Sequence, residues 1–193
     1  MNVFVLCAGR TASTAFSAAC LHIENFTSAH ESRVNILGKE KLLYPENHIE
    51  VDNRLSWFIP QLEEKYGDDA FYVYLKRDSH KIAKSYLERW GLTESIVKAY
   101  GHGILMMPTI TKEQRYDVCL DYVHHVEQSI AHFLKNKSHT LEMNTDSLKE
   151  DFGHFWEGIG AQGNFESALA EFDVQHNLNN TSVLTRLKRL VKG

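Results

Sequence analysis

A short apolar run followed by a loop of small residues constrains the fold of this chain more than any other stretch. Residues 2–7 are rich in β-branched and aromatic side chains, which is typical of a buried strand. A loop of small residues follows over 9–14, and residues 13–24 then place apolar side chains at helical spacing. This order predicts a strand, a loop and a helix.

The composition of the loop predicts an anion site. Small residues let backbone N–H groups close around an anion, and the N-terminus of a helix adds a partial positive charge. Arg10 adds a full charge and several hydrogen-bond donors. The loop is not a Walker A motif, because Thr14 stands where that motif has its second glycine and no lysine follows. An ordinary strand–turn–helix corner is the alternative interpretation.

A second stretch repeats the pattern further along the chain. Residues 71–76 predict a strand and residues 79–89 a helix. Arg77 stands at the end of this strand, and Ser85 lies eight residues further on, inside the helix. An arginine can grip a phosphate through a charged pair of donors, and a serine can add its hydroxyl. The stretch therefore predicts a second phosphate site.

The two stretches together resemble the sulfotransferases that use PAPS, 3′-phosphoadenosine-5′-phosphosulfate, as sulfuryl donor. In that family a loop of the type x-[KR]-[ST]-[GA]-[ST]-[ST] binds the 5′-phosphosulfate, and a segment of the type Arg-[ND]-P-x-x-x-A-x-Ser binds the 3′-phosphate. Both motifs occur here in the family's order and spacing. The resemblance implies that PAPS would be bound by Gly9, Arg10, Thr11, Ala12, Ser13, Thr14, Arg77 and Ser85.

Three positions depart from the family's pattern. Ala12 stands where glycine is usual, Ser79 where proline is frequent, and Arg10 where the cytosolic animal members have lysine. None of these changes removes a charge that the donor needs. The chain is also short for the family.

A polar cluster after the predicted strand at 26–29 supplies candidates for the catalytic base. The acceptor hydroxyl must lose its proton as the sulfuryl group arrives, so a base within hydrogen-bond reach is useful. The resemblance implies a glutamate or a histidine, and His30 and Glu31 stand side by side here. Glu31 is the first candidate and His30 the second. A capping or salt-bridging cluster is the alternative.

Asp52 and Arg54 follow another candidate strand, at 49–51. Asp52 is a third candidate for the base, but its position before the helix predicted over 55–66 favours an N-cap. The resemblance implies acceptor contacts after this strand. We therefore expect Asp52 and Arg54 to line the acceptor pocket.

The rest of the chain completes the predicted order of elements. The segment 90–112 contains three glycines and a proline; it is predicted to be a lid over the acceptor, and the alternatives are a partner surface or a helix at 93–100. His124 and Glu127 alone do not make a metal site, and no metal is expected. The remaining predictions are helices at 113–135, 152–159 and 165–172, a strand at 138–143, and a basic amphipathic helix at 182–192.

The length, net charge and cysteine content of the chain limit the class of protein to which it can belong. A chain of 193 residues with 43% hydrophobic and 24% charged residues predicts a single domain over 1–193. The net charge of −4 argues against a nucleic-acid partner. The three cysteines are odd in number and form no CxxC motif, which favours core thiols in a reducing compartment. No apolar run reaches membrane-spanning length, so a cytoplasmic protein without an integral membrane segment is expected.

Strands that alternate with helices predict an α/β fold of three layers, with a central, mostly parallel sheet flanked by helices. The resemblance sharpens this prediction to a P-loop-like sulfotransferase fold. It implies transfer of the sulfuryl group of PAPS to a hydroxyl or amine of a small-molecule or glycan acceptor, with Arg10 neutralising the charge on the departing phosphate. One alternative is a P-loop kinase with an altered loop, which would need magnesium. The other is a non-catalytic relative that keeps the nucleotide pocket.

Overall fold

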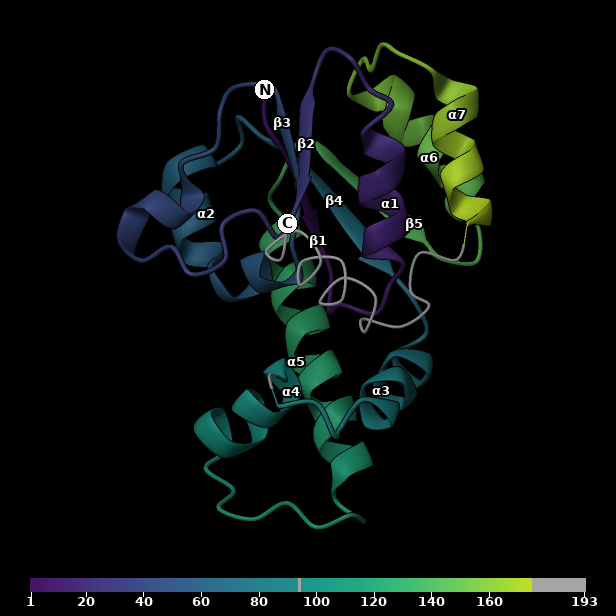
Figure 1. Ribbon diagram of the computed structural model, residues 1–193. Helices are drawn as coiled ribbons and strands as arrows, with labels where there is room; N and C mark the ends of the chain where they lie inside the picture. Colours follow the sequence, from purple (N-terminus) through teal and green to yellow (C-terminus); the bar gives the residue numbers. More distant parts are fainter. Residues whose placement is uncertain (94, 175–193) are drawn as a thin grey trace, which may run out of the picture.

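The computed structural model describes residues 1–93 and 95–174. Within this part of the chain, five parallel strands form one sheet in the order β2-β3-β1-β4-β5 (Figure 1). The strands are β1 (Val3–Leu6), β2 (Thr27–His30), β3 (His48–Val51), β4 (Phe71–Lys76) and β5 (Thr140–Asn144). The predicted basic helix at 182–192 lies outside the described residues.

Helices cover both faces of the sheet, which makes the three layers that the sequence predicts. The helices α1, α6 and α7 pack on one face, and α2, α3 and α5 contribute to the core on the other (Figure 1). The described helices are α1 (Ser13–Cys20), α2 (Ile59–Tyr66), α3 (Ser79–Glu88), α4 (Ile96–Ala99), α5 (Arg115–Leu134), α6 (Leu148–Gly158) and α7 (Phe165–Ala170).

The alternation of side chains along β1 explains why the sheet needs both helical layers. Val3 and Val5 face the core that α1 and α6 share, whereas Phe4 and Leu6 face the core on the side of α5. All four are fully buried. A parallel strand that is apolar on both faces is stable only where both faces are covered.

Three predicted helices differ clearly from the structure, by four residues at one end or by an interruption. Helix α1 ends at Cys20 rather than at residue 24. The N–H groups of residues 21–23 bond three residues back instead of four, and Glu24 N–H then donates to the carbonyl of Gln162 at 2.7 Å. The helix predicted over 55–66 is divided into a 3₁₀-helix, Asn53–Trp57, and α2. Helix α6 begins at Leu148, four residues before its predicted start.

The segment 90–112 folds into helical turns rather than a simple loop. Helix α4 leads directly into a π-helix, Tyr100–Ile104, and the Nδ1 atom of His102 lies 2.8 Å from the carbonyl oxygen of Met107. The predicted helix in this segment is confirmed, although it is shorter than expected.

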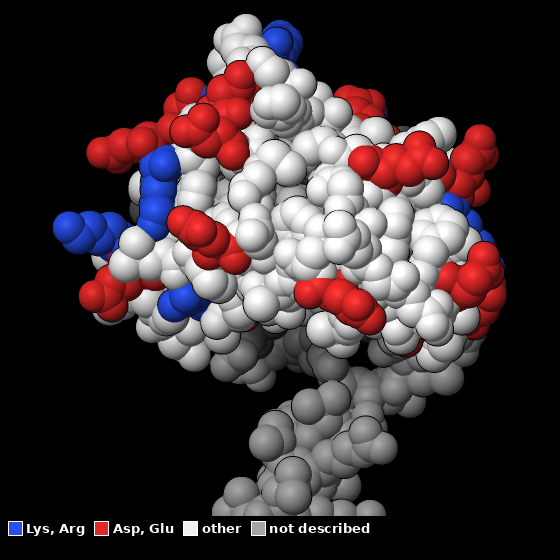
Figure 2. All heavy atoms as spheres, turned by 90° about the horizontal axis from the view of Figure 1, so that it is seen from above, with Lys and Arg blue, Asp and Glu red and all other residues white. Residues whose placement is uncertain are grey.

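The face above the amino ends of the strands carries no cluster of basic side chains in its described part (Figure 2). Acidic side chains there surround a broad uncharged centre. In the described part of the chain, no helix is both long and apolar enough to cross a membrane.

Candidate functional site

The loop between β1 and α1 has an unusual backbone at the carboxyl edge of the sheet. Gly9, Arg10 and Ala12 have φ values of 80°, 60° and 60°, in the left-handed region. A Cβ atom on Gly9 would lie 2.3 Å from the hydroxyl oxygen of Tyr86, so only glycine fits there. This conformation turns the chain sharply from the strand into the helix.

Hydrogen bonds from three other elements fix the loop. The hydroxyls of Tyr86 and Tyr122 both donate to the carbonyl oxygen of Ala8, at 2.7 and 3.3 Å. The Nη1 atom of Arg77 donates to the carbonyl oxygen of Arg10 at 2.8 Å. The end of β4 and helices α3 and α5 therefore hold the loop from one side.

The two motifs predicted from sequence meet through their side chains. The Nε atom of Arg10 donates to the hydroxyl oxygen of Ser85 at 3.0 Å, across 75 residues of sequence. Burial and the nearby guanidinium of Arg89 lower the pKa of Arg10, and Arg77 adds to the effect. Glu88 acts in the opposite direction but does not outweigh them, so the cations around Arg10 make a site that favours an anion.

A cavity of about 360 Å³ opens in front of the loop. Its size falls within the range of small-molecule sites. Five of the predicted donor-binding residues line it, namely Arg10, Ala12, Ser13, Thr14 and Arg77. Gly9 and Thr11 do not line it, and Thr11 is a buried residue of the loop. Ser85 is linked to the cavity through Arg10.

Three further residues line the same cavity and were not predicted as site residues: Lys81, Thr145 and Asp146. Lys81 lies in the first turn of α3, and its Nζ atom is 3.6 Å from Asp146 Oδ1. Thr145 and Asp146 directly follow β5. Ligands of α/β folds bind at the carboxyl ends of strands, so the position after the last predicted strand is a signal for Thr145 and Asp146.

The two base candidates sit at the end of β2, beside the loop. His30 is the last residue of β2, and its Nε2 atom lies 3.3 Å from the hydroxyl oxygen of Ser13. Glu31 has a left-handed backbone, with a φ of 51°, and its N–H donates to the carbonyl oxygen of Val51 at 3.1 Å. The structure thus brings His30 to the loop and puts Glu31 directly after it.

Asp52 and Arg54 are bound to each other. One oxygen of Asp52 accepts from the backbone N–H and the Nε atom of Arg54, at 2.8 and 2.9 Å, and the other is paired with its Nη2 atom. This confirms the N-cap predicted for Asp52, here on a 3₁₀-helix. Burial alone would lower the pKa of Arg54, but the hydrogen bonds and charge of Asp52 outweigh it and raise that pKa.

The Asp52 carboxylate is therefore a poor candidate for the base. It is 3% exposed and both of its oxygens already accept hydrogen bonds. The Arg54 side chain is 29% exposed and is the member of the pair that can reach a ligand. Among residues 1–93 and 95–174, no group of three or more metal-ligating side chains occurs.

A solved structure with a similar fold is the crystal structure of mouse sulfotransferase SULT7A1 complexed with PAP. The two structures have a TM-score of 0.59 and 14% sequence identity, over 89% of this chain and 63% of that chain. The likeness confirms the predicted fold, which is α/β and sulfotransferase-like. The present chain spans less than two-thirds of the length of that protein. No protein-family model matches the sequence, and no curated protein matches it.

Proposed function

We propose that this protein is a sulfotransferase that moves the sulfuryl group of PAPS to a hydroxyl or amine of a small-molecule or glycan acceptor. One observation carries the proposal: Arg10 and Arg77 line one cavity with the first residues of α1, at the carboxyl edge of the sheet. The likeness to a sulfotransferase complexed with PAP supports this reading.

In the donor site, Arg10 and Arg77 would bind different phosphate groups of PAPS. The backbone N–H groups of residues 9–14 and the N-terminus of α1 would hold the 5′-phosphosulfate. Arg77 and Ser85 would bind the 3′-phosphate. Arg10 would leave its hydrogen bond with Ser85 to neutralise the charge that grows on the departing phosphate.

The acceptor side would supply the base. An acceptor oxygen or nitrogen bonds to the sulfur as the bond between sulfur and the phosphate oxygen breaks, and the acceptor's proton passes to a base within reach. Glu31 is the first candidate for this base and His30 the second; the bond between His30 and Ser13 at the loop, with Glu31 next in sequence, supports this choice. Arg54, held by Asp52, would contact the acceptor.

Calorimetric titration with PAP, in the absence of magnesium, tests the donor site on the wild type and on Arg77→Ala. A charge-assisted hydrogen bond contributes about 1.5–3 kcal/mol, so we expect Arg77→Ala to weaken PAP binding by about 10–100-fold. Lys76→Ala is the matched control, because Lys76 is the neighbouring cation but pairs with Glu142 and lies outside the cavity. Its PAP affinity should stay within about twofold of the wild type.

Binding of ATP with magnesium in place of PAP would refute the proposal and favour a kinase. PAP binding without turnover on a broad panel of acceptors would favour a non-catalytic relative. Thermal unfolding of each variant checks that a loss of binding does not reflect a loss of fold, since Arg77 also bonds to the loop.

A further inference from the structure

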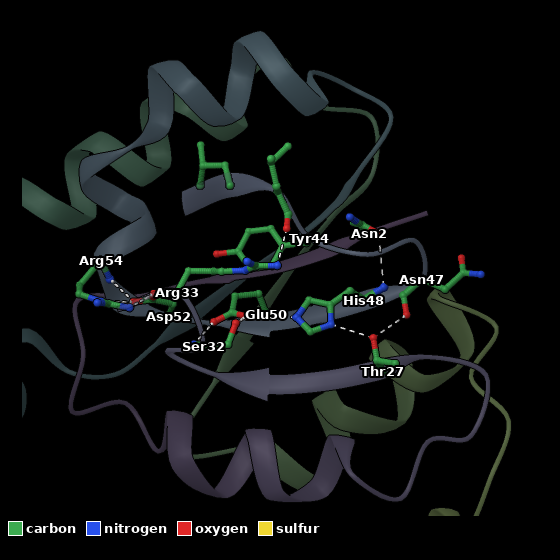
Figure 3. A network of polar contacts seen from close by, with 12 residues as sticks. Asn2, Thr27, Ser32, Arg33, Tyr44, Asn47, His48, Glu50, Asp52 and Arg54 are labelled. Atoms are coloured by element: carbon green, nitrogen blue, oxygen red, sulfur yellow. Dashed lines mark hydrogen bonds and ion pairs between the residues drawn. The ribbon is translucent and has the colours of Figure 1, made fainter. Parts of the chain in front are cut away.

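A stripe of buried ionisable side chains follows β3. His48 and Glu50 point to the same face of this strand, and Asp52 continues the stripe just beyond its end (Figure 3). They are 6%, 0% and 3% exposed. Charged residues are almost never buried so fully unless they are paired, and burying them is costly. The cost of burying such a stripe beside a candidate active site suggests that it serves the site.

The Glu50 carboxylate is fully satisfied by three donors. It accepts from the backbone N–H of Ser32 at 2.8 Å, from the hydroxyl of Ser32 at 2.5 Å, and it lies 3.0 Å from the Nε2 atom of His48. His48 Nδ1 in turn lies 2.8 Å from the hydroxyl oxygen of Thr27, and the ring of Tyr44 stacks on His48 (Figure 3). The Glu50 carboxylate therefore has its strongest contacts at Ser32, at one end of the network, and Thr27 lies at the other end.

Glu50 therefore holds the residue that follows the base candidates. Ser32 comes directly after Glu31, whose φ of 51° is unfavourable for a residue with a side chain. Such strain persists only where neighbouring contacts over-determine it, and it is common at functional sites. Two hydrogen bonds from Ser32 to Glu50 and one from Glu31 N–H to Val51 fix this turn from both sides.

We infer that Glu50 is a positioning residue for sulfuryl transfer: through Ser32 it holds the His30–Glu31 turn so that the base faces the loop after β1. This inference rests on the proposed function and deepens it. Glu50 does not touch the acceptor, since its side chain is fully buried. Its effect is geometric, and a displacement of about 1 Å in a reacting group can cost about 10²-fold in rate.

Cleavage of PAPS with water as the acceptor tests the inference without knowledge of the natural acceptor. A water oxygen bonds to sulfur, the bond between sulfur and the 5′-phosphate oxygen breaks, and one proton passes to the base, which gives sulfate and PAP. We would measure this rate at saturating PAPS, together with PAP affinity by calorimetry, on the wild type and three variants. Ser32→Ala removes one bond to Glu50, Ser32→Thr keeps the hydroxyl, and Thr27→Val removes the bond at the far end of the same network.

We expect Ser32→Ala to lower the cleavage rate by about 10-fold or more while its PAP affinity stays within about twofold, because only the position of the base changes. Ser32→Thr and Thr27→Val should keep rates near that of the wild type. Ser32 is exposed, so these substitutions leave the core intact and the variants should fold.

Two results would overturn the inference alone: an unchanged rate in Ser32→Ala, or an equal loss of rate in Thr27→Val, which would mean that the network acts only through stability. A wild-type protein that neither binds PAP nor cleaves PAPS would overturn the proposed function, and the inference with it.

Discussion

At the scale of single residues, Ala12 carries a backbone conformation that suits glycine better. Its φ of 60° costs a residue with a side chain roughly 1–2 kcal/mol, whereas glycine adopts it freely. Glycine also loses more conformational entropy on folding than alanine does, which offsets about 0.5–1 kcal/mol of the relieved strain. We expect Ala12→Gly to stabilise the protein by about 0.5 kcal/mol, as the free energy of unfolding in urea would show.

Ala15→Gly is the matched control, because Ala15 lies in α1 with helical backbone. A glycine inside a helix costs about 1 kcal/mol relative to alanine. The two substitutions therefore remove the same methyl group from positions three residues apart and should change stability in opposite directions. A loss of stability in both variants would contradict the account of strain at Ala12.

At the scale of elements, the π-helix depends on a glycine that packs closely. A Cβ atom on Gly101 would lie 2.6 Å from Ile110 Cδ1 and 3.1 Å from Val118 Cγ1. Overpacking of this kind typically costs about 1–3 kcal/mol, so we expect Gly101→Ala to lower the free energy of unfolding by that amount. Gly103→Ala, two residues away in the same element and with no atom within 4 Å, should not destabilise the protein. Equal effects of the two substitutions would refute this packing argument.

Elements whose signals are local could be predicted from the sequence. The apolar runs gave β1 and β4, and the strand–loop–helix pattern at Arg10 and Arg77 gave two elements that line one cavity. The end of α1 could not be predicted, because the chain that follows it bonds to residue 162, far along the sequence. Asp146 follows a predicted strand, but its place in the same cavity as Arg77 depends on β5 lying beside β4, which no local pattern shows.

The proposed role of Glu50 also could not be predicted from the sequence, for a related reason. The alternation of polar and apolar residues from His48 to Val51 is typical of a strand with one face in water. In the structure the loop after β2 and the ring of Tyr44 cover that face, so the polar side chains are buried and must bond to one another. Burial that depends on a distant loop leaves no local signal.

At the scale of the whole molecule, buried thiols and phenols make the free energy of unfolding fall at alkaline pH. Burial raises the pKa of Cys7 to about 11, and it raises the pKa values of Cys20, Tyr86 and Tyr122 above their ordinary range. In the unfolded chain these groups titrate near pH ~8.5 for cysteine and ~10 for tyrosine. The unfolded state therefore loses protons first as the pH rises.

The sign of the pH dependence follows from this order. Stability is fully present below about pH 8.5, because both states are then protonated, and it falls as the pH rises toward the folded pKa values. Each such group contributes a slope of about −1.4 kcal/mol per pH unit between its unfolded and folded pKa. We expect the free energy of unfolding, measured in urea from pH 7 to 11, to be constant at first and then to fall steeply above about pH 9.

Cys20→Ala isolates one part of this slope, because Cys20 is fully buried in α1, away from the candidate site. The variant loses some stability at pH 7 through the smaller side chain, but above pH 9 its stability should fall less steeply than that of the wild type, by up to about 1.4 kcal/mol per pH unit. The slope, unlike the stability at pH 7, reports only on titration. Parallel curves for the two proteins above pH 9 would mean that the Cys20 thiol titrates alike in the folded and unfolded states, and that the alkaline loss arises elsewhere.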